Sequence, residues 1–391
     1  MSLGLLVRAV LAGALAAPSP PMPSHGWAAD RLSARHPLVI LAPRPEAKRA
    51  ALVVRFHSGA VDDGERPGLT RVAQHTLLEA SREVRYRDLV RQVIGADATL
   101  DLDTGLAECT FTLEAGRGDF DRLAALVVDD PAFGNRPTGT EAGVEAIVLD
   151  DVRRQLAGPL TPANATVVLA GGFNVASARR TLARLSGGKA IDRAPPQITT
   201  PFSLQIPSRR EVYLVAYRTS YETPEQVAVA RLATALMEER IFWFFRDRGV
   251  GYSQSVEPIR RTWTNLFLVT LPARDPAGIP LIPLLEDEMA AVRDGRFSDA
   301  DFARNRAWVL ASMERTDAEP LALASALADG NGAVWFGPDV TQALQRLDRE
   351  GFVKGAAQLL NEPSSVRILY WPQASRRGAI PQFSRQTRGA R

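Results

Sequence analysis

The sequence predicts an α+β protein whose two halves repeat the same order of strands and helices. Apolar residues with the period-two spacing of strands alternate along the chain with apolar residues at helical spacing. Residues 111–115 resemble residues 269–273 at an offset of 158, and residues 166–169 resemble residues 366–369 at an offset of 200. Because the two matches occur in the same order, they indicate a duplication.

In the first half, each element follows from its apolar pattern. Two short apolar runs predict the opening strands, and the alternation on either side of Gly105 predicts a hairpin. Apolar residues three or four positions apart predict helices. We expect strands at 39–41, 51–56, 99–104, 106–113 and 166–169, and helices at 69–80, 86–94, 120–128, 144–156 and 175–185.

In the second half, the same order recurs after a proline-rich linker at residues 193–201. The two offsets differ by 42, so the first half is about 42 residues shorter between the two matches. We expect strands at 211–217, 266–271 and 366–370, and helices at 225–245, 281–292 and 299–313.

Composition places the chain among ordinary globular proteins. It has 391 residues, 46% of them hydrophobic and 23% charged, which is enough for two domains. The last twenty residues hold five arginines and no acid, and without them the formal net charge of +3 falls close to zero. This basic tail could contact an anionic membrane or nucleic acid, or be a solvated terminus. No nucleic-acid-binding motif is present, so we expect no nucleic-acid partner.

The N-terminus reads as a signal peptide or a disordered leader over residues 1–30. Arg8 supplies a positive charge, a short apolar run follows at 9–17, and small residues offer cleavage sites. This pattern predicts export, to the periplasm for example, with a cytoplasmic location as the alternative. Folded structure is expected to begin near Leu38, and no segment is apolar enough to span a membrane.

Cys109 is the only cysteine, so the chain cannot form an internal disulfide. It lies in an alternating run of a predicted strand, where a buried, unreactive thiol is the expected state.

Residues 67–75, PGLTRVAQH, resemble the zinc-binding helix of the insulinase/pitrilysin family, the inverted zincins. In that family the helix reads P-G-L-x-H-x-x-E-H, with two zinc-binding histidines and a glutamate as general base. Here Arg71 replaces the first histidine and Gln74 the glutamate, and only His75 remains. A guanidinium repels a cation, and an amide cannot take a proton from water. The resemblance therefore predicts a member that has lost its zinc chemistry.

Four more segments resemble the same family in the same order, and the resemblance covers nearly all of residues 37–372. It implies that each half is an antiparallel sheet with helices packed on one face. The domains implied are a degenerate, shortened N-terminal domain at 37–192 and a C-terminal domain at 201–372, followed by the basic tail at 373–391. The similar segments are residues 139–151, 165–173, 245–253 and 297–303.

The family's third zinc ligand is a glutamate on a helix that this chain lacks. Residues 131–135 run almost directly into 139–140, so the missing helix accounts for the shorter first half. Residues 148–151 loosely resemble the family's ligand helix, which would make Asp151 a shifted ligand. The flanking sequence fits the next helix of the family better, so we do not assign Asp151 to zinc. Catalytic zinc needs three protein ligands and an open position, so we expect no cofactor in this chain.

Arg71, Gln74 and His75 are spaced i, i+3, i+4 and are expected to share a helix face opposite Leu69, Val72 and Ala73. The shared face is either a vestigial cleft wall that meets a substrate or partner, or a solvated polar surface.

Separately, His57 ends a predicted strand, where a polar strand-end residue is more common than a metal ligand.

Residues 245–253, FRDRGVGYS, resemble the family's second-half motif L-R-E-x-R-G-L-x-Y-S. In the family, an Arg and a Tyr of this motif bind the substrate carbonyl, and Arg and Tyr donors can stabilise developing negative charge. Tyr252 matches the Tyr directly. A strict register puts Phe245 at the Arg position, so Arg246 or Arg248 would have to take that role. The alternative is that these residues form only a helix-to-strand turn.

The resemblance implies a pseudoenzyme: a non-catalytic subunit that forms a heterodimer with a zinc-bearing family peptidase and helps bind its peptide substrate. Some two-chain family members divide the zinc site and the Arg/Tyr pair between subunits in this way. The alternatives are a purely structural homologue without substrate contact, or a metallopeptidase with non-standard ligands. No motif of another hydrolase class is present.

Overall fold

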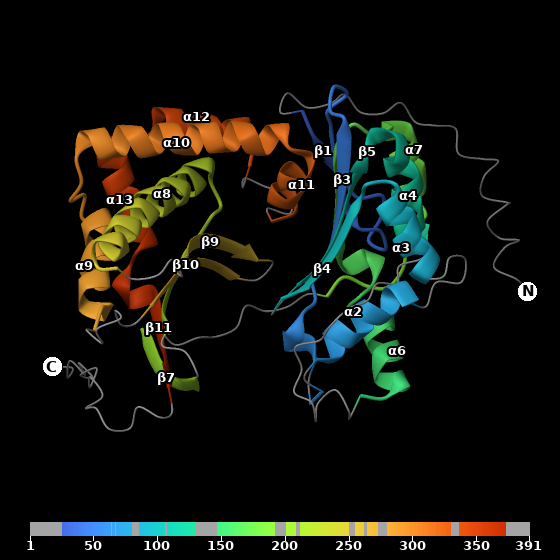
Figure 1. Ribbon diagram of the computed structural model, residues 1–391, viewed down its shortest axis with the longest axis horizontal. Helices are drawn as coiled ribbons and strands as arrows, with labels where there is room; N and C mark the ends of the chain where they lie inside the picture. Colours follow the sequence, from blue (N-terminus) through green and yellow to red (C-terminus); the bar gives the residue numbers. More distant parts are fainter. Residues whose placement is uncertain are drawn as a thin grey trace, which may run out of the picture.

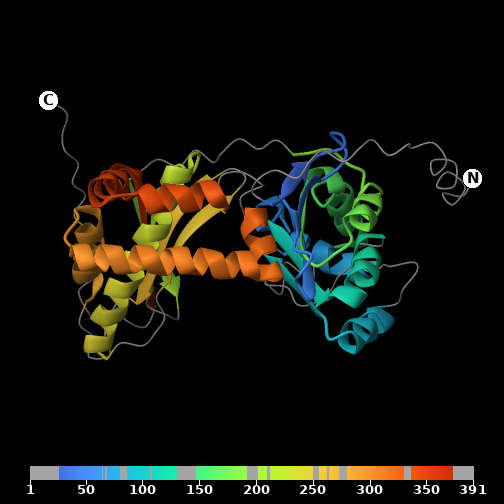
Figure 2. The same ribbon diagram turned by 90° about the horizontal axis from the view of Figure 1, so that it is seen from above.

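In the computed structural model, two sheet-containing halves lie side by side along the long axis of the molecule (Figure 1). Helices α10 (Asp299–Ala318) and α11 (Pro320–Asp329) extend from the second half to the first, as the view from above also shows (Figure 2). The structure describes residues 26–63, 65–66, 68–79, 86–105, 108–129, 147–191, 201–208, 212–249, 255–261, 264–272, 280–329 and 336–372.

The first sheet has six strands in the order β1-β2-β6-β3-β5-β4. Strands β2 and β6 run parallel, and every other neighbouring pair is antiparallel. The strands are β1 (Ala28–Asp30), β2 (Leu38–Pro43), β3 (Arg49–Phe56), β4 (Thr99–Thr104), β5 (Cys109–Gly116) and β6 (Ala165–Gly171). The helices of this half are α2 (Leu69–Glu79), α3 (Tyr86–Gly95), α4 (Arg117–Asp129), α6 (Leu149–Ala157) and α7 (Val175–Leu182).

The second sheet repeats this order without a counterpart of β1, as β7-β11-β8-β10-β9. Its parallel pair, β7 with β11, corresponds to β2 with β6. The strands are β7 (Phe202–Ser208), β8 (Val212–Arg218), β9 (Ser255–Arg261), β10 (Thr264–Pro272) and β11 (Ser365–Pro372). The remaining helices are α8 (Pro224–Asp247), α9 (Ile282–Arg293), α12 (Pro338–Arg346) and α13 (Arg349–Leu359).

Strand register confirms the internal repeat residue by residue. Val53 pairs with Val168 and Thr112, and Leu214 pairs with Ile368 and Thr270. The neighbours of Leu214 therefore lie 200 and 158 positions after those of Val53, which are the two offsets found in the sequence.

The expected α+β fold of two halves is confirmed, with one parallel strand pair in each sheet as an added detail. The first sheet carries its own helices on one face. On the other face it packs against α11, which belongs to the second half (Figure 1). Buried residues of α11 therefore join both sheets into one core: Leu323, Ala324, Leu327 and Ala328.

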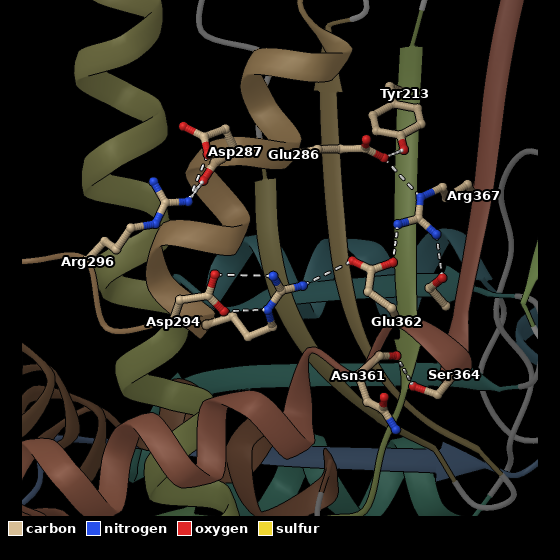
Figure 3. A network of polar contacts seen from close by, with 11 residues as sticks. Tyr213, Glu286, Asp287, Asp294, Arg296, Asn361, Glu362, Ser364 and Arg367 are labelled. Carbon is tan, nitrogen blue, oxygen red and sulfur yellow. Dashed lines mark hydrogen bonds and ion pairs between the residues drawn. The ribbon is translucent and has the colours of Figure 1, made fainter. Parts of the chain in front are cut away.

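On the helix-covered face of the second sheet, a polar network fixes α9 to the strands (Figure 3). Arg367 of β11 is ion-paired with Glu362 and, at 3.0 Å, with Glu286 of α9. Tyr213 of β8 donates a hydrogen bond of 2.6 Å to Glu286. Burial and this bond to a carboxylate raise the pKa of Tyr213, so the phenol stays protonated.

Folded structure begins earlier than the sequence predicted. Strand β1 overlaps the end of the expected leader, and Trp27 packs against the main core, so the expectation of a start near Leu38 is wrong. Residues 1–25 and 373–391, which hold most of the leader and the whole basic tail, lie outside the described residues. Among the helices that the structure describes, none is long and apolar enough to cross a bilayer.

Candidate functional site

Helix α2 is the element that would carry zinc in a working member of the resembled family. It begins after Gly68, whose φ of +99° is a conformation that side-chain-bearing residues rarely adopt. Asp63 caps the helix: its carboxylate accepts hydrogen bonds of 2.6 Å from the backbone N–H groups of both Gly68 and Thr70. The start of the degenerate motif is thus a well-formed helix N-terminus.

Gln74, at the position of the general base, is completely buried. Its amide nitrogen donates to the carbonyl oxygens of Asp103 (3.2 Å) and Thr110 (3.3 Å), and the Thr104 hydroxyl donates to its amide oxygen. All three partners belong to the paired ends of β4 and β5. Gln74 therefore fastens α2 to the β4–β5 hairpin and does not face solvent.

This contact needs an amide. A carboxamide carries two N–H donors and one acceptor oxygen, whereas an ionised carboxylate can only accept. A glutamate here would turn a negative charge towards two carbonyl oxygens in a buried position. Glutamine at this position satisfies its buried environment, whereas glutamate, the residue that the resembled zinc motif has there, would not.

The expected common face of Arg71, Gln74 and His75 is therefore only partly correct. Gln74 belongs to the buried side of α2 with Thr70 and Ala73, while Arg71 is half-buried. The alternative prediction, that this face is a solvated polar surface, is wrong for Gln74. His75 lies on α2, but its side chain is outside the described residues.

Asp151, which the sequence did not favour as a zinc ligand, has arginine and backbone partners. It lies on α6, 6% exposed, and is ion-paired with Arg154 and, at 3.6 Å, with Arg66. It also accepts a hydrogen bond of 3.1 Å from the backbone N–H of Val148. The carboxylate is thus engaged in holding the start of α6.

Two other polar residues of this half behave as structural groups. His57 follows β3, and its Nε2 lies 3.0 Å from the Thr166 hydroxyl of β6. Cys109 is buried in β5, as predicted, and burial together with the nearby carboxylates of Asp62 and Glu108 raises its pKa well above the usual value. Its thiol therefore stays protonated and unreactive. Within the described ranges, no three metal-ligating side chains gather.

The second-half motif lies at the C-terminal end of α8. Phe245, the strict match for the family Arg, is completely buried and cannot meet a substrate. Arg246 stacks on the ring of Trp243 at 5.1 Å, and Trp243 is itself 50% exposed. Arg248 lies 3.8 Å from the ring of Phe244 and donates a hydrogen bond to the backbone oxygen of Phe244. Tyr252 lies outside the described residues.

Both arginines are solvent-exposed, and Arg248 lines a pocket of about 530 Å³ between α8, α9 and α10. Arg246 has the less constrained guanidinium, because Arg248 is held by both the ring and a backbone carbonyl. Helices α2 and α8 lie in different halves, on opposite sides of the molecule (Figure 1). The structure therefore does not bring the two sets of sequence-predicted site residues together within one chain.

Solved structures share this architecture. A protease from Helicobacter pylori superposes with a TM-score of 0.70 at 12% identity, over 89% of this chain and 100% of that chain. A peptidase M16 inactive domain from Pseudomonas fluorescens gives a TM-score of 0.70 at 15% identity, over 88% of this chain and 98% of that one. The fold is that of the M16-like peptidases.

A third match relates the chain to part of a larger enzyme. The chain aligns with 49% of the periplasmic protease PqqL from Escherichia coli, over 93% of its own length, with a TM-score of 0.64 and 13% identity. Such low identities establish the fold and leave the activity open. No protein-family model and no curated protein matches the chain.

Proposed function

We propose that the chain is a degenerate insulinase-family subunit that does not cut peptides itself. It pairs with a zinc-bearing relative and helps to hold that relative's peptide substrate. The observation that carries this proposal is the buried amide of Gln74, because it fixes the former zinc helix to the sheet through bonds that a general base could not make.

Substrate contact is assigned to the exposed end of α8 and the residues that follow it. Arg246 and Tyr252 would bind the peptide backbone, with Arg248 as the alternative arginine. Since α2 and α8 lie far apart in one chain, these donors could only serve a zinc site carried by another subunit. The predicted N-terminal signal would place the complex in the periplasm, and any zinc would belong to the partner.

Restoring the zinc motif is expected to leave the isolated chain inactive and free of stoichiometric zinc. The double substitution Arg71→His and Gln74→Glu rebuilds H-x-x-E-H, but the third ligand helix is still missing, and an incomplete site binds zinc weakly. In addition, position 74 is directed into the β4–β5 hairpin. Metal analysis after dialysis and a peptide-cleavage assay test this. Chelator-sensitive cleavage by the double variant alone would contradict it.

Co-expressed with an intact H-x-x-E-H relative from the same genome, the chain is expected to form a heterodimer that cleaves peptides better than either subunit. Tyr252→Phe should then lower kcat by about 100-fold with little change in KM, because a lost transition-state donor acts on kcat. The more damaging of Arg246→Ala and Arg248→Ala identifies the active arginine. Steady-state kinetics of the purified heterodimers measure both effects.

A scaffold without substrate contact is the competing function. The same fold occurs in Complex III2 from Candida albicans, at a TM-score of 0.63 and 13% identity. A heterodimer whose activity is unchanged by Tyr252→Phe and by both arginine variants would favour this scaffold role.

A further inference from the structure

The second sheet has an apolar face that none of the described helices covers. Its other face, with Tyr213, Val269 and Leu369, is buried with α8 and α9 in the main core. The uncovered side chains of β8, β10 and β11 alternate with these along each strand. Together with Leu204 of β7 they lie outside that core, half-buried or exposed. We call this surface the open sheet face: Leu204, Val212, Leu214, Leu266, Leu268, Val366, Ile368 and Tyr370.

The internal repeat shows how unusual this exposure is. Ile40 pairs with Val168 in the first sheet, and Leu204 pairs with Ile368 at the same place in the second. Ile40 is completely buried, whereas Leu204 is 41% exposed. Contiguous apolar surface of this kind marks an interaction site in a soluble protein.

The repeat also shows what kind of element fits such a face. On the first sheet the equivalent surface packs against α11, a ten-residue helix with the sequence PLALASALAD. Its buried side chains are small or unbranched at Cβ, namely alanines and leucines, which let a helix lie close on a sheet. The expected occupant of the open sheet face is therefore a short helix with an Ala/Leu face.

The first half of this chain has a much shorter connection than the one that carries α11 in the second half. In the second half, residues 294–348 connect α9 to α13. This connection includes α11, so it reaches the first sheet and leads back again. The first half has only residues 130–148, about 19 residues, between the corresponding helices α4 and α6. Because α10 alone spans about 30 Å, a path out and back needs about 60 Å. That path uses nearly all of the roughly 65 Å that about 19 extended residues can reach.

Two other sources in the same protein fit poorly. The tail 373–391 follows β11 directly, but it has five arginines, two glycines and a proline, and few large apolar residues. A second copy of the chain would have to give up its own α11, whose Leu323 and Ala324 are completely buried. Residues 1–25 also contain alanines and leucines, but they belong to the predicted export signal, so we expect the helix to come from a different protein.

We propose that the open sheet face docks a short Ala/Leu-faced helix contributed by the partner subunit. This inference rests on the proposed heterodimer and names the surface through which it assembles. The partner's helix would take the place on the second sheet that α11 takes on the first. It would remove Leu204 and Ile368 from water together.

The test compares two leucines of equal exposure on opposite sides of the second half. Leu204 lies on the open sheet face at 41% exposure, and Leu284 lies on α9 at 42%. Leu204→Glu is expected to raise the Kd for the zinc-bearing relative by at least about tenfold, because docking would bury a charge. Leu284→Glu should leave it within about twofold. Equal effects of the two variants, measured by sedimentation with thermal unfolding as a folding check, would overturn the proposal.

Photo-cross-linking identifies the occupant directly. Benzoylphenylalanine is placed at position 204 or 284 in the full chain, and the purified complex is irradiated and mapped by mass spectrometry. Cross-links from 204 to a helix of the relative support the proposal. Cross-links from 204 to residues 1–25, 130–146 or 373–391, to a second copy of the chain, or to an added peptide substrate overturn it.

Failure of the heterodimer itself gives a distinct result. If no complex forms with the relative, the proposed function fails. Experiments on the isolated chain then test whether the open sheet face is an uncovered docking surface. Anilinonaphthalene sulfonate fluorescence that falls with Leu204→Glu but not with Leu284→Glu would support an uncovered docking surface. Dye binding that is insensitive to position 204, or that appears only after residues 373–391 are removed, would show that the chain covers the face itself.

Discussion

Replacing Gln74 by glutamate is expected to lower the free energy of unfolding by about 3 kcal/mol at pH 7. The substituted side chain would be buried, and its charge would face the carbonyl oxygens of Asp103 and Thr110, which now accept N–H bonds. Only the hydroxyl of Thr104 could still donate to it. Urea unfolding of the purified variant measures the loss.

The pH dependence separates this cause from a packing defect. A glutamate in this place would have a folded pKa raised above its unfolded value of about 4.3, because burial disfavours the charged form. Stability would then be lost as pH rises from the unfolded pKa through the folded one, and recovered on acidification. A packing defect would show no such recovery.

Gln342 provides a matched control for the same chemical change. It is exposed on α12, so Gln342→Glu is expected to alter the free energy of unfolding by no more than about 0.5 kcal/mol. If the two variants were equally stable, the hydrogen bonds of the Gln74 side-chain amide would contribute no stability that a carboxylate cannot replace.

The repeat and its register were the most predictable part of the fold. The offsets of 158 and 200 relate equivalent strands of the two sheets. Short sequence matches therefore identified β10 as the equivalent of β5, and β11 as the equivalent of β6. Buried strands keep such patterns because both of their neighbours constrain them.

The edge strands β7 and β9 were not predicted from the sequence. They contain Pro207 and Pro258, which remove a backbone donor and weaken the strand pattern, and proline is tolerated in strands mainly at such edges. Helix α11 was missed for a different reason. It is apolar on most sides because it packs between two halves, so it lacks the polar face that marks a surface helix.

For the candidate site, the sequence predicted which residues stand at the positions of the resembled zinc motif but not where their side chains point. Spacing places Arg71 and Gln74 on one side of α2, yet only the position of the β4–β5 hairpin determines that Gln74 is buried. An amide can be either exposed or buried, depending on whether carbonyl partners are available. Those partners are 29 and 36 residues away along the chain.

Replacing Arg55 by methionine is expected to lower the free energy of unfolding by about 3 kcal/mol. Arg55 of β3 is 8% exposed and lies between Glu108, which immediately precedes β5, at 3.5 Å, and Asp329 at the end of α11, at 2.5 Å. Its loss would remove the ion pair with the buried carboxylate of Glu108 and the ion pair with Asp329 that joins the two halves. The exposed ion pair of Arg296 with Asp287 gives the control, since Arg296→Met should leave the midpoint of urea unfolding almost unchanged.

The second half suggests how to separate these two contributions. By strand register, Ala216 and Leu266 occupy the places of Arg55 and Glu108, so that half has no ion pair there. The double variant Arg55→Met and Glu108→Leu is therefore expected to recover most of the loss, because it removes both buried charges. Urea unfolding of the single and double variants measures this. A double variant as unstable as Arg55→Met alone would instead assign the stability to the bond with Asp329, and thus to the attachment of α11 to the first sheet.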